Sequence, residues 1–495
     1  MSLNRTSIQP GPRSSLSIIS MIALLAGPFV TMLDSSIVNV ALPQIARFTE
    51  APLSETQWVA SGYLLSLAVA LAATAYLAKR FGTVRMYFLS LIGFTLTSAL
   101  CALSPSLSWL VAARVLQGGF GAALVPLAMG MLMGKSRGQI PAAAGIVLFL
   151  APALGPTLGG LLVHWAGWSS IFWINVPIGA IACFAVLRLP KGLGLPGDPQ
   201  TRFDAFGFTL LAAGLALTTY GASRGAQYGW LTDLSWPFWS VGLSALGVYI
   251  AWALWQAEHP VVSLAPFTRP QSALALLLST LTSVVQFAVP VLIPVFLQNL
   301  QGYSAMVVGL TLMPQGLVTG FSMVATSSVQ KRLGLRNTVL LGLLLLALGS
   351  AGLLLVDVST PLWVTALILC GRGFASGLIV QPLLSVLLGN LESREAADGN
   401  TLFNIAQRVG GTLGITLLVS YFQIREHFQV SRVVHMLGLS QISSGILAGL
   451  PSQARAQLAH AAITGFHEVI WVLIWACVLT FILAWLLHDP HRAAS

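Results

Sequence analysis

Apolar stretches of about 20 residues, separated by short polar or basic loops, recur along the whole chain. A helix of about that length crosses the roughly 30 Å hydrocarbon core of a bilayer. Inside lipid, a single span satisfies its backbone hydrogen bonds only as a helix. The pattern therefore predicts an all-α integral membrane protein with fourteen spans, near 18–41, 55–77, 84–104, 108–132, 140–163, 169–189, 205–222, 237–256, 271–298, 304–327, 337–356, 360–388, 399–421 and 464–487.

Composition supports this class. Hydrophobic residues make up 56% of the 495 residues and charged residues only 8%, against about a quarter charged in soluble domains. The ten-residue alternating segments of a transmembrane barrel are not seen. The net charge of +10 would favour nucleic acid in a soluble protein, but here the basic residues lie in loops, so we expect no nucleic-acid partner. The four cysteines lie far apart in apolar stretches, and we expect neither a metal nor a cofactor.

The basic residues also predict orientation. Loops after even-numbered spans, together with both termini, hold roughly sixteen lysines and arginines, against about five on the other side. We therefore expect a multi-pass protein of the plasma (inner) membrane with both termini in the cytoplasm. The more polar stretch 422–463 is predicted as an outer loop with a short surface helix, serving either as a cover over a pocket or as a solvated connector.

The chain contains an internal repeat. Lys79-Arg80-Phe81-Gly82 after span two matches Lys331-Arg332-Leu333-Gly334 after span ten, and Arg114 and Gly118 resemble Arg372 and Gly377. We predict an N-terminal six-helix bundle (1–190), a linker with two additional helices (191–260) and a C-terminal six-helix bundle (261–495). Membrane proteins built from repeats are mostly transporters, with a binding site near the midplane between the halves.

Asp34 is the candidate for chemistry. The chain has 14 acidic residues, and Asp34 is the one that lies well inside a span. A carboxylate at membrane depth costs several kcal/mol unless it is paired, hydrated or protonated. Arg114 in span four is predicted at a similar depth. Two readings stay open: a static ion pair that joins two helices, or a titrating carboxylate tuned by its partner for proton coupling or cation binding.

Two further stretches indicate close helix packing. In span four, Arg114, Gln117, Gly118 and Gly121 share one helical face. In span five, prolines that remove backbone hydrogen bonds alternate with glycines that allow close helix contact. This run predicts a bend at an extracellular gate and consists of Pro152, Gly155, Pro156, Gly159 and Gly160.

Together these motifs resemble the major facilitator superfamily, specifically its drug:proton antiporters with fourteen spans. The resemblance covers nearly the whole chain. It is carried by Leu33 to Pro43, Gln57-Trp58-Val59 with Tyr63, Arg114 to Gly121, Gly155-Pro156 with Gly159-Gly160, Ile171 to Gly179, Phe203-Asp204, and Asn404 with Arg408 to Gly411. It implies the major facilitator fold of two six-helix bundles, here with two inserted helices. It also implies alternating access, with outward drug flux driven by the proton gradient.

One motif departs from the superfamily pattern. The loop after span two normally reads Gly-x-Leu-Ala-Asp-Arg-x-Gly, whereas this chain has Ala75 at the glycine and Lys79 at the aspartate. The resemblance implies that this aspartate acts as a cytoplasmic latch, so its loss puts the latch in doubt. Arg80, Gly82 and Arg85 remain as the expected cytoplasmic loop motif.

The resemblance implies a small lipophilic and often cationic cargo, together with protons and membrane lipid as partners and a functional monomer. A pocket for such cargo needs aromatic walls and an acid. The expected lining is Asn39, Trp58, Tyr63, Gln117, Phe149, Gln286, Gln315 and Arg408. Arg372 and Arg408 are cations inside spans without an evident acid partner, so anionic or zwitterionic lipids stay open as cargo.

Other functions compete with drug export. A dedicated exporter of a native metabolite or lipid would use the same fold. A membrane-embedded enzyme would need a catalytic constellation, and the chain has no HExxH, GxSxG or Walker motif. We therefore expect no enzyme. A channel would not need Asp34 to titrate or the proline and glycine run in span five.

Overall fold

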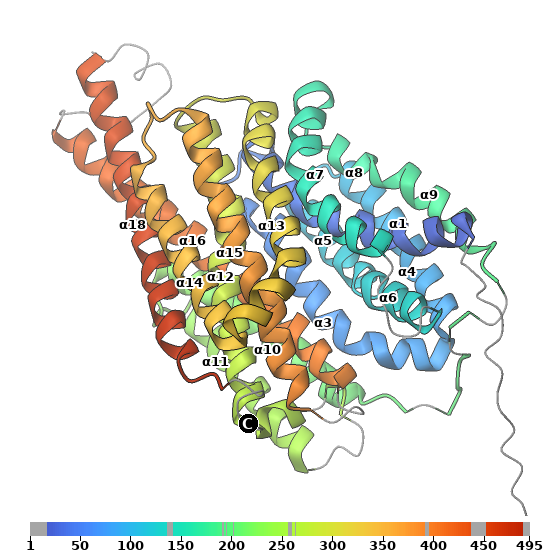
Figure 1. The fold of residues 1–495 in the computed structure, drawn as a ribbon. Helices are drawn as coiled ribbons and strands as arrows, with labels where there is room; N and C mark the ends of the chain where they lie inside the picture. The colour runs from blue at the N-terminus through green and yellow to red at the C-terminus, as the bar shows by residue number, and fades with distance from the viewer. Residues whose placement is uncertain are drawn as a thin grey trace, which may run out of the picture.

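The structure is a computed structural model, and Figure 1 shows its ribbon. It describes residues 17–135, 142–190, 193–194, 196–200, 202–255, 260–262, 264–391, 396–436 and 452–488. Within these residues every regular element is a helix. The elements are α1 (Ile18–Thr49), α2 (Leu53–Thr56), α3 (Trp58–Phe81), α4 (Thr83–Ala102), α5 (Leu107–Gly121), α6 (Leu124–Lys135), α7 (Ala142–Ala166), α8 (Ser170–Trp173), α9 (Asn175–Val186), α10 (Ala205–Tyr228), α11 (Trp236–Trp255), η1 (Ala265–Thr268), α12 (Pro270–Asn299), α13 (Ala305–Leu333), α14 (Leu335–Gly352), η2 (Leu353–Leu355), α15 (Leu362–Gly389), α16 (Ala396–Met436) and α18 (Ser452–Ala484).

The helices match the predicted spans. Among the described residues, 12 helices are long and apolar enough to cross a membrane. The places of predicted spans five and six are taken by α7 and by the shorter apolar stretch Ser170–Val186, which contains α8 and α9. The all-α membrane fold predicted from the apolar pattern is therefore confirmed.

Two glycines mark the internal repeat in the backbone. Gly82, between α3 and α4, has φ 89°, and Gly334, between α13 and α14, has φ 80°. Side chains other than glycine rarely adopt this region of φ. Both glycines let one helix end and the next begin within a single residue, after the matching Lys79-Arg80 and Lys331-Arg332 pairs. The sequence echo therefore reflects a repeated helical hairpin.

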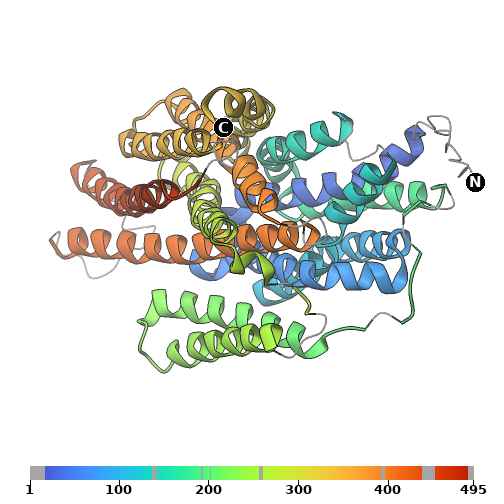
Figure 2. The same cartoon turned by 60° about the horizontal axis from the view of Figure 1, so that its bottom comes forward.

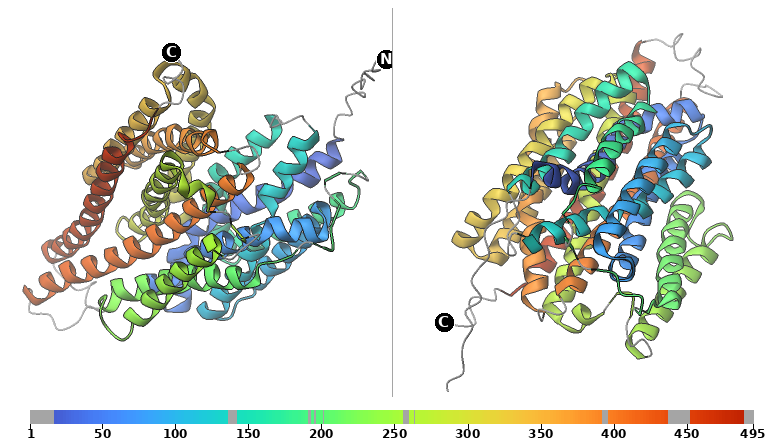
Figure 3. Two further views of the ribbon diagram at one scale, coloured as in Figure 1. Left: turned by 90° about the horizontal axis from the view of Figure 1, so that it is seen from below. Right: turned by 90° about the vertical axis from the view of Figure 1, so that its right-hand side faces the viewer.

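The helices form two groups, with a separate hairpin at the side. Helices α1 to α9 make the N-terminal half and α12 to α18 the C-terminal half, drawn in blue and teal and in yellow to red in Figure 1. The hairpin of α10 and α11 packs against α16 and α3. Figure 2 and Figure 3 show this green hairpin on the flank of the assembly. Helix α10 therefore contacts one helix of each half, at the edge of their interface.

The halves are joined at one end. Among the described residues, the hydrogen bonds between the halves all lie toward the end where α1 and α12 finish and α13 begins, which we call the sealed end. In donor-to-acceptor order they are Gln298 to Val40 (3.0 Å), Thr157 to Gly309 (3.3 Å), Gln57 to Ser420 (3.1 Å), Gln57 to Thr416 (3.4 Å) and Ser54 to Gln423 (2.6 Å). This pattern is typical of one end state of an alternating-access protein.

The described parts of the predicted outer loop 422–463, residues 422–436 and 452–463, are helical. Helix α16 continues to Met436, and α18 begins at Ser452, so both helices project past their neighbours in Figure 1. Glu468 of α18 accepts hydrogen bonds from Arg425 (2.9 Å) and from Gln429 (2.7 Å) of α16. The polar residues that suggested a loop therefore pair across two packed helices. Residues 437–451 lie outside the described part of the chain.

The expected cytoplasmic loop motif lies beneath the linker to α10. The backbone N–H of Asp198 donates to the carbonyl of Lys79 at 2.7 Å. A Cβ on Gly197 would lie 2.8 Å from the carbonyl oxygen of Arg80, so the linker backbone approaches closely. Arg80 is partly buried, whereas Arg85 is exposed. In this structure the junction of α3 and α4 is held by the linker, at the place where the superfamily pattern has an acid.

Candidate functional site

Asp34 of α1 and Arg114 of α5 form an ion pair inside the N-terminal half. Both side chains are 0% exposed, and Nη1 of Arg114 donates to Oδ2 of Asp34. The same nitrogen donates to Oε1 of Gln117 at 2.7 Å, and Nε donates to the carbonyl of Val59 at 2.9 Å. The guanidinium therefore joins α1, α3 and α5 at one point.

The second carboxylate oxygen is also bonded. Oδ1 of Asp34 accepts from Nδ2 of Asn175 at 3.0 Å and from Nε2 of Gln117 at 3.4 Å. Asn175 also donates to Oγ of Ser98 at 3.1 Å. An ionised carboxylate has acceptors only, and here donors from α5 and α9 face both of its oxygens. The carboxylate is thus the hub of a network that includes five helices of this half, namely α1, α3, α4, α5 and α9.

Aromatic rings cover the network. The Tyr63 ring lies 4.0 Å from Cζ of Arg114, and the Phe172 ring lies 5.5 Å from it. Such contacts favour a cation over the ring face. Two buried atoms, Nη2 of Arg114 and Oδ1 of Asn175, have no hydrogen-bond partner in the described structure. The network is therefore not fully satisfied, which is unusual for buried polar groups and is often associated with function.

Some predicted pocket residues belong to this network. Gln117 and Tyr63 are 0% exposed and contact Arg114, so they do not line a cargo cavity. Asp34 is equally buried, so a dissolved cation cannot reach its carboxylate in this conformation. Asn175 and Ser98 were not predicted as site residues. Asn175 lies in the Ile171 to Gly179 signature, and that signature was the signal that could have identified it.

Helix α7 packs against α1 beside the ion pair. A Cβ on Gly155 would lie 1.8 Å from Oγ of Ser36, and a Cβ on Gly159 would lie 2.8 Å from Cγ1 of Ile37. Ser36 and Ile37 lie two and three residues after Asp34 in α1, so the glycines bring the α7 backbone against the turn that carries the carboxylate. A movement of α1 at Asp34 must therefore move α7 or break this contact.

The next residues of α7 pack against α13 of the other half. A Cβ on Gly160 would lie 2.3 Å from the carbonyl oxygen of Ala305, and a Cβ on Gly309 would lie 2.1 Å from that of Pro156. Thr157 bonds across the same contact. These close approaches form the seal. The predicted side-chain roles of Phe149 and Pro152 lie outside the described residues, and the predicted bend stays a prediction, since α7 is one helix from Ala142 to Ala166.

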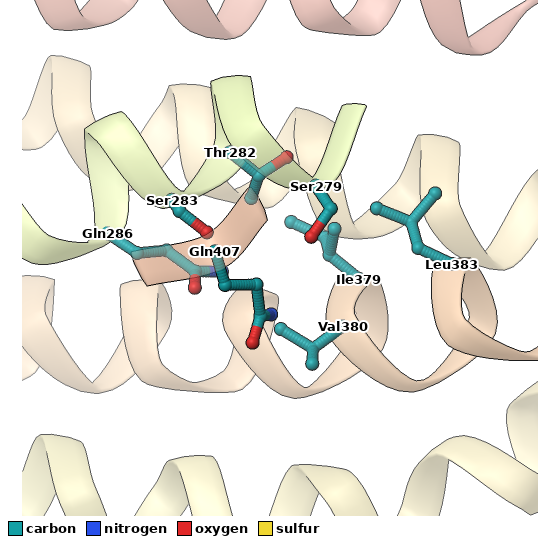
Figure 4. Close-up of a pocket in the computed structure, with 8 residues that line it drawn as sticks. All are labelled: Ser279, Thr282, Ser283, Gln286, Ile379, Val380, Leu383 and Gln407. Carbon is teal, nitrogen blue, oxygen red and sulfur yellow. The ribbon is translucent and has the colours of Figure 1, made fainter. Parts of the chain in front are cut away.

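In the C-terminal half, a narrow polar space lies between α12, α15 and α16 (Figure 4). Gln286, a predicted pocket residue, lies on it beside Gln407, which was not predicted. Figure 4 shows these two side chains close together, with Ser279 and Ser283 of α12 directed into the same space. The other lining residues are Thr282, Ile379, Val380 and Leu383.

The remaining predicted pocket residues are dispersed. The Trp58 ring lies 6.1 Å from the Tyr220 ring of α10, so it contacts an inserted helix and not a central cavity. Asn39 is partly buried, and its Oδ1 has no partner in the described structure. Gln315 lies on α13 where a Cβ on Gly373 would be 2.4 Å from its carbonyl oxygen, so its backbone meets α15. Sequence spacing could not show which face of each helix looks inward.

Arg372 and Arg408 differ in their surroundings. Arg372 of α15 is 2% exposed, and its guanidinium donates to Oγ of Ser350 and to the carbonyl of Val285 at 3.2 Å. Arg408 of α16 is partly exposed, and no described residue gives its guanidinium a hydrogen bond or an ion pair. Neighbouring helices therefore give the Arg372 guanidinium two acceptors, whereas the described residues give the Arg408 guanidinium none.

Comparison with known proteins identifies the family. The profile of the Major Facilitator Superfamily matches residues 24–415. A multidrug resistance protein B homolog of Mycobacterium tuberculosis is 30% identical over 466 residues, covering 90% of this chain and 85% of that protein. The chain belongs to the Major Facilitator Superfamily. The resemblance drawn from the motifs is confirmed, and superfamily membership makes the protein a multi-pass membrane transporter of small molecules and not an enzyme.

Other superfamily members agree in sequence and fold. The multidrug export protein EmrB of Escherichia coli is 27% identical over 503 residues, covering 97% of this chain and 96% of EmrB. The crystal structure of a bacterial homologue of the human lysosomal transporter Spinster, at 15% identity, has a TM-score of 0.64 and covers 96% of this chain and 98% of that one. This structural likeness confirms the two-bundle fold.

We predict that Asp34 and Arg114 are energetically coupled. Asp34→Asn leaves the Arg114 guanidinium buried without a counter-charge. Arg114→Gln leaves the Asp34 carboxylate buried without a counter-charge. Each change is expected to lower the free energy of unfolding by about 3–5 kcal/mol. The double variant should lose clearly less than the sum, by at least about 1 kcal/mol. Denaturation in mixed detergent measures this double-mutant cycle, and additive losses would show that the pair contributes nothing as a pair.

We predict that Gly309→Val opens the seal, because the new side chain cannot fit against the carbonyl of Pro156. The readout is maleimide labelling of a Thr157→Cys reporter, with the native Cys101, Cys183, Cys370 and Cys477 replaced by alanine. Labelling should rise several-fold. Gly371→Val is the matched control, since a Cβ there meets nothing within 4 Å. Equal labelling in all three proteins would contradict a seal formed by α7 and α13.

Proposed function

We propose that this protein exports lipophilic drugs across the plasma membrane in exchange for protons, with Asp34 as the proton-binding residue. The single observation that carries the proposal is the fully buried Asp34–Arg114 pair, placed where α1 packs against the gate helix α7. Relatives named as multidrug resistance and export proteins support drugs as the cargo class. Carboxylates at membrane depth are typical of proton relays in transporters.

The contacts suggest how the proton would act. Protonation of Asp34 would remove the charge that holds Arg114, so the network around Gln117 and Asn175 would rearrange. Because Ser36 and Ile37 lie against Gly155 and Gly159, that rearrangement would pass from α1 to α7. Helix α7 would then release α13 at Gly160. A proton can shift the equilibrium between the two states only if it binds one of them more tightly.

The proposed orientation follows from the basic loops. We place the sealed end outside and the end that carries Lys79-Arg80 and Lys331-Arg332 in the cytoplasm, with both termini there. The moving units would be 1–190 and 261–495, with 191–260 between them. We further propose that the protein acts as a monomer in contact with membrane lipid, without a nucleic-acid partner and with the proton gradient as its energy source.

The test measures the exchange of drug for protons in proteoliposomes, with an enclosed pH-sensitive dye that reports proton movement. A panel of one lipophilic cation, one neutral drug and one lipophilic acid keeps the test independent of cargo charge. Asp34→Asn should lower gradient-driven transport at least about tenfold, while exchange without a gradient persists, because the fixed neutral side chain no longer binds and releases a proton. Asp233→Asn, the same change at an exposed acid, is the control.

Two outcomes would overturn the proposal. Unchanged proton movement in the Asp34→Asn protein would remove Asp34 from the coupling mechanism. Passive, non-saturable flux of the cargo in the wild-type protein would indicate a channel and not an exchanger.

A further inference from the structure

The charged groups at the interface between the halves do not match a cationic cargo. Asp34 is sealed and already receives hydrogen bonds from Arg114, Gln117 and Asn175. Arg408 is the cation there that is partly exposed and has no partner among the described residues. A guanidinium inside a spanning helix is costly unless it meets water, an acceptor or an anion. The described residues thus give the Arg408 guanidinium neither an acceptor nor a counter-charge.

The position of Arg408 follows from the contacts of α16. Gln57, at the start of α3, donates to the carbonyl of Thr416 and to Oγ of Ser420. Helix α16 packs against α3 of the other half, and Arg408 lies close enough to Tyr63 of α3 for its charge to act on the Tyr63 hydroxyl. The eight residues from Thr416 back to Arg408 correspond to about 12 Å along the helix axis, away from the sealed end. Arg408 therefore lies in the interface between the halves, just below its closed part.

The depth of Arg408 suits a binding site. The span expected from the apolar pattern runs near 399–421, so Arg408 lies nine residues inside it, which is about 14 Å by helix rise. A hydrocarbon core is roughly 30 Å thick, so Arg408 lies near its middle. This is the depth at which transporters built from repeats bind their cargo, between the two halves.

Polar side chains near Arg408 also have hydrogen-bond donors without an acceptor in the described structure. Gln407, the residue before Arg408, lines the polar space in Figure 4 together with Gln286. Nε2 of Gln286 and Oγ of Ser279 are buried and have no hydrogen-bond partner in the described structure, and Ser279 is 2% exposed. No acid is among the residues that line this space. The α12 and α16 side chains that line this space thus offer polar donors and no carboxylate, and Arg408 follows Gln407 on the adjoining face of α16.

We propose that the cargo is a lipophilic organic anion, such as a carboxylate, and that Arg408 is the residue that binds its charged group. This rests on the proposed export function and names its substrate class. A guanidinium presents a planar fork of donors that matches a carboxylate in a bidentate pair. The other arginines of the spanning core do not compete, because Arg114 is bonded to Asp34 and Arg372 to Ser350 and Val285.

The test is equilibrium binding to the purified full-length protein in detergent, without any proton gradient. The probes are a matched pair, radiolabelled diphenylacetate and diphenylmethylammonium, which share the two rings and differ in charge. The wild-type protein should bind the anion at least about tenfold more tightly than the cation, a difference of about 1.4 kcal/mol. Arg408→Gln should lose that preference, and Arg408→Lys should keep most of it.

The control is Arg432→Gln, which removes the same charge from an exposed position of the same helix and should bind both probes as the wild-type protein does. Thermal unfolding of each variant confirms that it is folded. Tighter binding of the cation by the wild-type protein, or unchanged anion binding by folded Arg408→Gln, would overturn the proposal. Because binding needs no proton gradient, this result is independent of whether the Asp34→Asn protein loses coupling.

Discussion

The rest of the structure depends on one constraint, which is that a charge inside a lipid-embedded bundle is costly unless a counter-charge, a hydrogen-bond acceptor or water meets it. Asp34 and Arg114 pair with each other and also form hydrogen bonds with the side-chain amides of Gln117 and Asn175. The cost of separating such a pair in a low-dielectric interior is large, so the surrounding helices are held in one arrangement. The same cost makes protonation a strong signal, because it removes one charge and leaves the other unpaired.

Two successive helix contacts connect Asp34 to the seal. The turn after Asp34 touches α7 through Gly155 and Gly159, and the next residues of α7 touch α13 through Gly160 and Gly309. At each of these glycines a larger side chain would collide with the facing helix. Close-packed interfaces of this kind do not deform gradually, so a change at Asp34 either leaves the seal intact or releases it. The glycines therefore connect the charge to the gate.

Much of the fold could be read from the sequence, because apolar length and loop charge are local properties. The importance of Asp34 and Arg114 could also be read, because an ion inside a span is costly wherever it points. Helix faces could not be read. Trp58 was predicted in the pocket but contacts Tyr220 of α10, since nothing local shows where an inserted hairpin packs. Residues 422–436 and 452–463 were predicted as a loop but are helical. Sequence alone does not distinguish polar residues that pair between two helices from polar residues of a loop.

The two proposals assign the proton and the cargo to different residues, whereas a cationic cargo would have to share Asp34 with the proton. If the proton binds Asp34 and an anionic cargo binds Arg408, the two never compete for one carboxylate. The charges also change the energetics of export. One proton moving in against one anion moving out transfers two charges in the direction favoured by an interior-negative membrane. At about 2.3 kcal/mol per charge per 100 mV, the membrane potential alone then supplies roughly 4.6 kcal/mol per cycle. A monovalent cation exchanged for one proton would gain nothing from the potential.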